Sequence, residues 1–405
     1  MFRKLLRISL VFLVAAFAAQ AKAQPYLLAF ECQATTDSDY AALQANLDNV
    51  DGCVHFINWS AIETSQGNYD FPDGLDNDPH FTPYIGKTCG GNLRAAHDCY
   101  IVPVIWLISD GGDNRSTPGY VYSAAWASSL GVTQLDYAWC GAYEGDKSGS
   151  GTGHSGDATT FPAVWEKPFK VASENFIQRL IPHLNGLTTG IGPQIPYVRI
   201  GYASGGEAFP TCETQLQTIA KVSDVQTLMA NYYVPGYKAE AQFIKNQLPK
   251  KQMEMSVNCG SDLAWCQYNS LPESDELEKD ALGIGNQGLQ AGDGPAIQNG
   301  QETSNGWYAD YTTYPNTYWR EMQTLTQSCP TGAPSGDCTA KGLTTTGSLT
   351  DIFPVVSKYA NLNSLELYIG DILCTYDSSY QAPSGTPTYA DCQKAGYRAA
   401  FSHYF

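Results

Sequence analysis

Short apolar runs recur along the chain, and stretches long enough for a helix or a loop separate them. Eight of these runs have the length and composition of buried strands. They cover Tyr26–Glu31, Cys53–Asn58, Ile101–Leu107, Tyr197–Tyr202, Met253–Asn258, Ala281–Gly285, Tyr318–Gln323 and Leu365–Ile369. Alternation of strands with helices is typical of α/β proteins with a parallel sheet. Eight such units predict a single (β/α)8 barrel, also called a TIM barrel.

Helical periodicity is readable between most of these strands. The expected helices span Asp39–Val50, Ala163–Leu184, Val222–Leu248, Leu349–Ala360 and Asp391–His403, and unit six gives the weakest helical pattern. The segment Ser109–Phe161 is too long for a plain connection and is rich in Gly, Ser, Asp and aromatic residues. We therefore expect elaborated loops at the carboxyl face of the barrel, where long loops build binding sites. A second domain in this segment, or disorder in Gly149–Gly156, is the alternative.

Residues 1–23 have the organisation of a secretory signal peptide. A basic start with Arg3 and Lys4 leads into the apolar run Ile8–Ala19, and Ala21 and Ala23 place small residues at the cleavage positions. The run is shorter than the roughly 20 residues that span a bilayer as a helix. We expect a secreted or periplasmic protein whose mature part, residues 24–405, is one catalytic barrel domain. A retained membrane anchor is the alternative.

The charge and the apolar content exclude two classes of protein. The chain has 23 Lys and Arg against 40 Asp and Glu, a formal net charge of −17, which excludes a basic nucleic-acid-binding protein. Hydrophobic residues make up 43% of the chain and aromatic residues 12%, which excludes intrinsic disorder.

Twelve cysteines in an exported chain predict disulfide bonds. Four pairs lie close in the sequence and are expected to close loops: Cys89 with Cys99, Cys259 with Cys266, Cys329 with Cys338, and Cys374 with Cys392. The sequence leaves open the partners of Cys32, Cys53, Cys140 and Cys212. No C-x-x-C motif occurs, and the six histidines show no H-x-x-x-H or other zinc-site spacing, so neither a metal nor a cofactor is expected.

Two glutamates stand where a barrel enzyme carries its chemistry. Glu207 follows the fourth strand after a turn of small residues, Ala203–Gly206, and Glu321 lies inside the seventh, otherwise apolar and aromatic run. Strands four and seven lie on opposite sides of an eight-stranded barrel, so their carboxyl ends would face each other across its mouth. Two such carboxyl groups can cleave a glycosidic bond. The alternatives are a solvated Glu207 and a Glu321 that pairs with Arg199 or Arg320.

The second strand leads into a phrase of spaced residues that is formed by Trp59, Ile62, Glu63, Gly67, Tyr69, Asp70 and Phe71. This phrase resembles the W-x-x-[IL]-E-x-x-x-G-x-[YF]-[DN]-[FW] signature of retaining (β/α)8 glycoside hydrolases, a clan with cellulase-like and β-galactosidase-like enzymes. The resemblance implies a secreted glycoside hydrolase that acts on a poly- or oligosaccharide by a retaining mechanism. It also implies Glu207 as the acid/base and Glu321 as the nucleophile.

Two positions depart from the pattern of that clan. Gly206 stands where an asparagine usually precedes the acid/base, and the usual arginine of the second strand is missing near His55. A catalytically inactive carbohydrate-binding barrel is therefore the alternative function. Glu302 is the rival nucleophile if strand seven lies elsewhere, and Glu63 is expected to anchor the loop after strand two.

Sugar rings stack their C–H faces on aromatic side chains, and amide groups bind their hydroxyls. The candidate substrate-binding residues are Trp59, His55, Trp106, Tyr202, Asn258, Asn286, Gln287 and Trp265. Each aromatic residue can instead belong to ordinary packing, and His55 can be a barrel-interior histidine. We expect a carbohydrate substrate as the partner, no nucleic acid, no membrane after signal cleavage, and a monomer.

Overall fold

The computed structural model describes residues 24–30, 32, 37–108, 116–132, 137–140, 159–204, 213–257, 271–290, 296–298, 301–303, 314–324, 327–330, 338, 346–359 and 361–405. Among the helices described, none combines the length and the apolar content that crossing a membrane requires.

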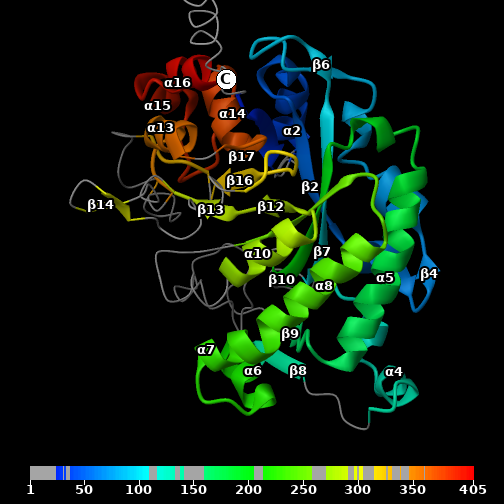
Figure 1. Cartoon of the computed structure of the whole chain (residues 1–405). Helices are drawn as coiled ribbons and strands as arrows, with labels where there is room; N and C mark the ends of the chain where they lie inside the picture. Colours follow the sequence, from blue (N-terminus) through cyan, green and yellow to red (C-terminus); the bar gives the residue numbers. More distant parts are fainter. Residues whose placement is uncertain are drawn as a thin grey trace, which may run out of the picture.

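Nine parallel strands form the central sheet (Figure 1). In chain order they are β1 (Tyr26–Phe30), β2 (Gly52–Asn58), β7 (Tyr100–Ile108), β10 (Tyr197–Ser204), β11 (Gln252–Ser256), β12 (Gly283–Gly285), β13 (Gln287–Leu289), β16 (Glu321–Thr324) and β17 (Ser364–Tyr368). Strands β12 and β13 flank Asn286 and act as one interrupted strand, because β12 pairs with β11 and β13 pairs with β16. A parallel bridge between Ile284 and Arg320 joins the two ends of the sheet. The predicted eight-unit barrel is therefore confirmed.

The register of the strands is that of a TIM barrel. Pairing leads from Phe56 through Val104 and Arg199 to Gly283, and continues through β16, β17 and β1. Once this line of paired residues has gone around the whole barrel, it meets the chain again at residue 48, which is eight residues before its starting point, Phe56. A shift of about eight residues around eight strands is the shear of this fold, and it stacks inward side chains from alternate strands in layers.

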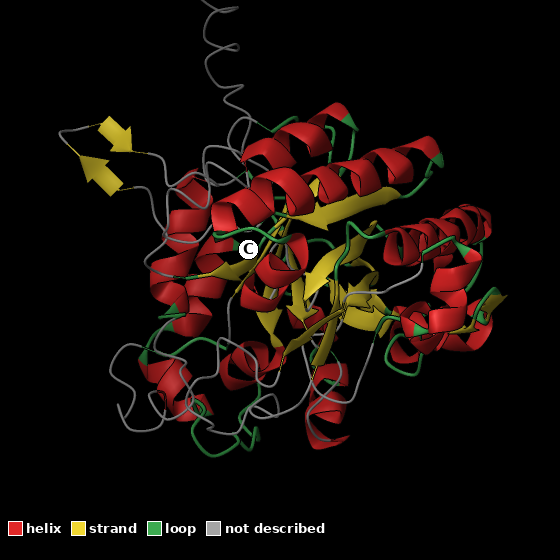
Figure 2. Ribbon diagram, turned by 90° about the horizontal axis from the view of Figure 1, so that it is seen from below, coloured by secondary structure: helices red, strands yellow, loops and turns green. Residues whose placement is uncertain are grey.

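The helices lie outside the strands, and Figure 2 shows them around the sheet. They are α2 (Asp37–Gln44), α3 (Trp59–Ile62), α4 (Ala124–Ser129), α5 (Lys167–Gly186), α6 (Glu213–Ala220), α7 (Val225–Leu228), α8 (Val234–Asn246), α10 (Leu271–Lys279), α13 (Leu349–Tyr359), α14 (Ile369–Tyr376), α15 (Tyr389–Lys394) and α16 (Tyr397–Tyr404). Short 3-10 or π turns are η1 (Leu47–Asn49), η2 (Pro72–Asp76), η3 (Thr82–Tyr84), η4 (Gly119–Tyr122), η5 (Gly192–Gln194) and η6 (Met229–Tyr233).

Most predicted helices are present, but two units differ from the regular pattern. The predicted helix Val222–Leu248 is divided into α7, the π turn η6 and α8. Between β2 and β7 the chain forms only single turns and two small antiparallel pairs, because Gly, Pro, Asn and Asp are frequent there. These pairs are β3 (Glu63–Ser65) with β4 (Asn68–Tyr69) and β5 (Thr88–Cys89) with β6 (His97–Asp98).

Two further hairpins lie in the connections of the barrel. Strands β8 (Tyr137–Cys140) and β9 (Thr159–Pro162) pair within the long segment after β7. Strands β14 (Ala296–Gln298) and β15 (Gln301–Thr303) pair between β13 and β16 and project away from the barrel in Figures 1 and 2. In unit six, where the helical pattern is weakest, the described part of the connection is therefore a hairpin.

The hydrophobic core has two layers separated by the sheet. A large outer cluster packs the sheet against the helices and includes Ile57, Ile105, Phe176 and Tyr237. A smaller cluster fills part of the barrel interior and consists of Leu28, Phe30, Val54, Val102, Val104 and Tyr197. Its apolar members come from β1, β2 and β7, so the opposite half of the barrel interior must be filled by other side chains.

Four disulfide bonds are described. Three of the predicted near-sequence pairs are confirmed: Cys89 with Cys99, Cys329 with Cys338, and Cys374 with Cys392. The fourth bond joins Cys32 to Cys53 and ties the end of β1 to β2, a pairing that the sequence left open. The predicted Cys259–Cys266 pair lies outside the described residues.

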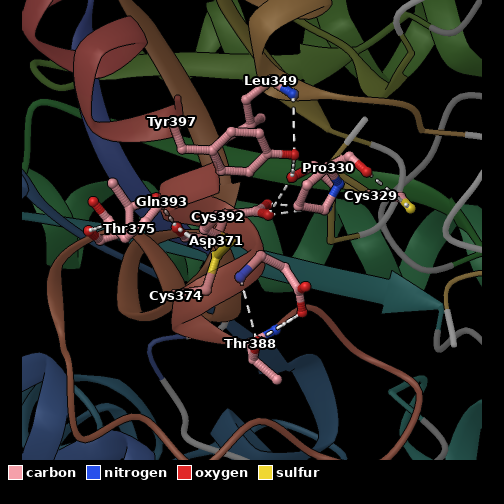
Figure 3. The surroundings of a disulfide bond; sticks show 12 residues. Cys329, Pro330, Leu349, Asp371, Cys374, Thr375, Thr388, Cys392, Gln393 and Tyr397 are labelled. Atoms are coloured by element: carbon pink, nitrogen blue, oxygen red, sulfur yellow. Dashed lines mark hydrogen bonds between the residues drawn. A yellow bond between two sulfur atoms is a disulfide. The ribbon is translucent and has the colours of Figure 1, made fainter. Parts of the chain in front are cut away.

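The Cys374–Cys392 bond joins α14 to α15 beside a buried polar contact (Figure 3). The Asp371 carboxylate accepts hydrogen bonds from the backbone N–H of Ser328 at 3.0 Å and from its hydroxyl at 2.6 Å. The Ser328 hydroxyl also lies 2.8 Å from the Tyr397 hydroxyl. Burial raises the pKa of Asp371 to about 7, although the hydrogen bonds from Ser328 oppose the shift. The bond and this contact together hold the last three helices on the barrel.

Replacing Cys374 and Cys392 together by serine should lower the free energy of unfolding by about 3 kcal/mol, since the bond closes a loop with a sequence separation of 18. Urea unfolding of the double variant and the wild type measures the difference. Equal unfolding midpoints, or a free thiol at either position in the wild type, would contradict the assignment.

Candidate functional site

Four charged side chains meet inside the barrel, in the half that the apolar cluster leaves free. Arg199 comes from β10, Glu254 from β11, Glu321 from β16 and Glu366 from β17, and all four are fully buried. Arg199 Nη1 donates to Glu321 Oε1 at 2.6 Å and to Glu366 Oε2 at 3.1 Å. We call these four residues the barrel-interior cluster.

Two neutral side chains also form hydrogen bonds with the barrel-interior cluster. Arg199 Nη2 donates to Gln323 Oε1 at 3.2 Å, and the Tyr197 hydroxyl donates to Glu366 Oε1 at 2.5 Å. Glycine at position 285 leaves room for both carboxyl groups, because a Cβ there would lie 2.5 Å from Glu321 Oε1 and closer still to Glu254 Oε1 and would force them to move. Because Gly285 of β12 has no side chain, the carboxyl groups of Glu254 and Glu321 fit beside it.

The protonation of the barrel-interior cluster follows from its charges. One guanidinium faces three carboxyl groups that have no contact with solvent, so full ionisation of all three is costly. Burial, and then the charge of Glu321, raise the pKa of Glu254 well above its ordinary value. Burial, and then Glu366, raise the pKa of Glu321 to about 8, even though Arg199 opposes the shift. The Glu254 and Glu321 carboxyl groups both lie next to Gly285, so a negative charge on one opposes ionisation of the other.

Glu321 lies deeper in the barrel than the sequence suggested. The expectation placed it at the carboxyl mouth, but Glu321 is the first residue of β16 and has 0% exposure. The next inward side chain toward the mouth is that of Gln323. The pairing of Glu321 with Arg199, stated above as the alternative, is present. Its role as a nucleophile stays a prediction.

Nearer the mouth, two aromatic rings stack on each other. Phe56 of β2 and Trp106 of β7 have ring centroids 4.2 Å apart and planes within 5°, and both are partly exposed. Trp106 was a candidate sugar contact, and its position near the carboxyl end of β7 keeps it one. The sequence did not single out Phe56 as a sugar contact, because a phenylalanine in a predicted strand usually belongs to the hydrophobic core. The alternation of inward positions along β2 from Val54 was the signal for it.

Three predicted substrate contacts are instead packing residues in this structure. Trp59 is fully buried, packs on Phe169 and Phe176 of α5, and therefore has no free ring face. Tyr202 is 3% exposed and packs on the helical side of β10. Asn286 is 2% exposed and donates to the Val257 carbonyl at 3.0 Å, which holds the interrupted strand to β11.

His55 also lies away from the barrel interior. It alternates along β2 with the inward Val54, and its neighbours on the same face, Cys53 and Ile57, belong to the outer core. The ring is 4% exposed and lies 4.0 Å from the ring of His80. Burial, and then the charge of His80, lower the pKa of His55 to about 3, so its imidazole is neutral.

The motif after strand two has a structural role in this fold. The Glu63 carboxylate accepts hydrogen bonds from the Trp59 indole at 2.8 Å, from the Gly67 backbone at 2.8 Å and from the Tyr120 hydroxyl at 3.0 Å. The expectation that Glu63 anchors the loop after strand two is confirmed. Gly67 has a φ of 71°, a left-handed conformation that favours glycine, and this explains the glycine of the motif.

Several candidates cannot be placed. Glu207, Asn258 and Trp265 lie outside the described residues, and the side chain of Gln287 on β13 is not described. Glu302 belongs to the β14–β15 hairpin, which is separate from the barrel sheet. Glu302 was an alternative nucleophile only if strand seven lay elsewhere in the chain. This does not apply, because Glu321 lies on β16.

Sequence reasoning missed the connection among the charges of the barrel interior. Arg199, Glu254 and Glu366 each stand alone in a predicted strand, in YVRIGY, MEMSVN and LELYI. A lone charge in a buried strand needs a partner. One cation and three anions on strands that line the same half of a barrel were the available signal.

No family model matches the chain, and no curated protein matches it. Among solved structures, the catalytic domain of a β-amylase from Paenibacillus polymyxa is similar, with 10% identity and a TM-score of 0.48 over 94% of this chain and 98% of that one. A GH10 xylanase from Bispora sp. MEY-1 with xylobiose has 10% identity and a TM-score of 0.45, over 87% and 85%. A GH10 endoxylanase from a sugarcane soil metagenome has 10% identity and a TM-score of 0.43, over 86% of each chain. The assignment of the barrel rests on strand order and closure, independently of these likenesses.

The free energy of unfolding should fall as the pH rises from about 4.5 toward 8. In the unfolded chain Glu254 and Glu321 titrate near 4.5, whereas in the folded protein both pKa values are raised, that of Glu321 to about 8. A raised folded pKa gives stability that is complete below the unfolded value and lost as the pH rises through the folded one. Thermal unfolding between pH 4 and pH 9 measures this.

Glu254→Gln should weaken this pH dependence, because a neutral amide replaces a buried carboxyl group that resists ionisation. Asp275→Asn, which removes an exposed carboxylate on α10, serves as the control and should leave the profile unchanged. A Glu254→Gln profile that coincides with the wild-type profile would show that this pair does not govern alkaline stability.

Proposed function

We propose that the chain is an exported glycoside hydrolase that cleaves a poly- or oligosaccharide by a retaining mechanism. Glu207 is the acid/base, and Glu321 is the nucleophile. The observation that carries this proposal is the eight-stranded parallel barrel in which β10 runs to Ser204, three residues before Glu207 in the sequence. Active sites of such barrels lie at the carboxyl ends of the strands.

Other features of the mouth support a sugar ligand. The stacked Phe56 and Trp106 rings are partly exposed near the carboxyl ends of β2 and β7, and aromatic faces suit the C–H faces of sugar rings. The four disulfide bonds fit the oxidising compartment that an N-terminal signal peptide would lead to.

The proposed chemistry divides between the two glutamates. Glu207 protonates the leaving oxygen, and a carboxylate on the other side of the sugar traps the anomeric carbon, with about 5 to 5.5 Å between the carboxyl groups. A raised pKa on Glu321 keeps part of its population protonated at neutral pH, so attack favours the form in which the proton resides on Glu254. For Glu321 to act, the sugar must reach it past Gln323.

A second candidate function is a catalytically silent carbohydrate-binding barrel. The observation that favours it is the burial of Glu321, whose carboxylate is held by Arg199 at 2.6 Å with no exposed surface. In this case Glu321 fills the barrel interior, and the aromatic rings at the mouth bind sugar without turnover. The two functions differ in whether a covalent glycosyl-enzyme forms.

The test is covalent labelling of the mature protein by activated 2-deoxy-2-fluoro glycosides of glucose, xylose and galactose, followed by mass spectrometry. The wild type should gain one glycosyl group on Glu321, and Glu321→Gln should gain none and lose roughly 10⁴-fold or more in kcat. Glu207→Ala should lose about 10²- to 10⁴-fold on substrates with poor leaving groups and far less on 2,4-dinitrophenyl glycosides, which need little protonation.

Glu366→Gln is the matched control, because Glu366 is a second buried carboxylate that binds Arg199. Its loss of thermal stability should resemble that of Glu321→Gln, while labelling of Glu321 persists. A folded Glu321→Gln variant that still forms the adduct would remove Glu321 from the mechanism. Saturable oligosaccharide binding without turnover or labelling by the wild type would support the silent barrel.

A further inference from the structure

A cluster of potential metal ligands lies apart from the barrel interior, formed by β2 and the segment that follows it. One ring nitrogen of His55, one of His80 and one carboxylate oxygen of Asp78 all lie within 4.8 Å of one another. None of these three residues takes part in the barrel-interior cluster or in the proposed reaction. Their sequence spacing matches no common zinc motif, so the fold rather than the sequence brings them together.

His55 contributes a buried nitrogen that has no partner. Its ring is 4% exposed, and Nδ1 has no hydrogen-bond partner among the residues that the structure describes. A buried polar atom without a partner costs about 1 to 3 kcal/mol, so such atoms are uncommon unless a ligand or water completes them. The centroid of the His55 ring lies 4.9 Å from that of Phe56 and 5.9 Å from that of Phe81.

His80 and Asp78 form a partly exposed pair beside His55. Asp78 Oδ1 accepts from the backbone N–H of His80 at 2.8 Å and lies 2.8 Å from His80 Nδ1. The His80 and Asp78 side chains are 29% and 13% exposed. An ion could therefore reach the cluster from solvent, while the buried His55 forms its inner wall.

We propose that His55, Asp78 and His80 form a binding site for a divalent first-row transition metal, best suited to Zn²⁺. Two imidazole nitrogens and one carboxylate oxygen are ligands that zinc accepts, and water would complete the four positions of a tetrahedral site. At zinc bond lengths of about 2.0 to 2.2 Å, the ligand atoms of a tetrahedral site lie about 3.4 Å apart, so separations of up to 4.8 Å need to shrink by up to about 1.4 Å. Small rotations of the partly exposed His80 and Asp78 can supply this.

A metal here would stabilise the irregular unit of the barrel. The segment between β2 and β7 forms only single turns and small hairpins among its elements, and η2 and η3 lie on either side of Asp78 and His80. A metal that binds His55 on β2 and these two residues would fix that segment to the sheet. Because it binds the folded chain and not the unfolded one, it should raise the melting temperature in a concentration-dependent way.

The test uses the untagged mature chain with its disulfide bonds intact, stripped with EDTA and dialysed. Calorimetric titration with Zn²⁺ should give one site per chain, and Co²⁺ should produce the visible absorption of a four-coordinate ion. Zn²⁺ should raise the melting temperature, and EDTA should reverse the rise. His80→Ala, which changes a partly exposed residue, should fold and should weaken Zn²⁺ binding by roughly 100-fold or more.

His183→Ala is the matched control. His183 Nε2 lies 2.8 Å from Asp76 Oδ1, so it forms a His–Asp pair with the same contact distance in the same region but is not part of the cluster. Its removal should leave the zinc affinity and stoichiometry unchanged. Absence of saturable binding in the wild type, or equal affinities in the wild type and His80→Ala, would overturn the proposed site.

Discussion

The ion pair of Arg199 with Glu321 and Glu366 is the interaction on which the barrel depends most. It joins β10 to β16 and β17 across the interior, with all three side chains fully buried. Breaking a buried pair by removing one partner typically costs about 3 to 5 kcal/mol, because the other charge is left uncompensated. A single guanidinium thus sets the geometry of strands that are distant in sequence.

The barrel interior is divided between two kinds of filling. The half lined by β1, β2 and β7 is apolar, while the half lined by β10, β11, β16 and β17 holds the barrel-interior cluster. The strands of the second half include the shortest of the barrel, with three residues each in β12 and β13 and four in β16. Hydrogen bonds between side chains such as Arg199 and Gln323 compensate there for the few backbone pairs that short strands can form.

The sequence was sufficient to predict which segments form strands, but not at which level of the barrel each strand residue lies. All eight predicted runs overlap the observed strands, because buried parallel strands are continuously apolar and easy to recognise. Strand seven, however, was expected at Tyr318–Gln323 and begins at Glu321, and a shift of this size moves a carboxylate from the mouth to the interior. The prediction of Trp59 as a substrate contact was wrong for a related reason. Its indole donates a hydrogen bond to Glu63 and its ring packs on α5, and the local sequence pattern does not reveal this packing.

A filled interior restricts where any chemistry of this barrel can occur. With Leu28 and Val102 on one side and Arg199 and its carboxylates on the other, packed side chains fill the lower levels, and the proposed approach to Glu321 is from above, past Gln323. Other substrate contacts must then come from the upper level, where Phe56 and Trp106 are partly exposed, and from the loops that follow the strands.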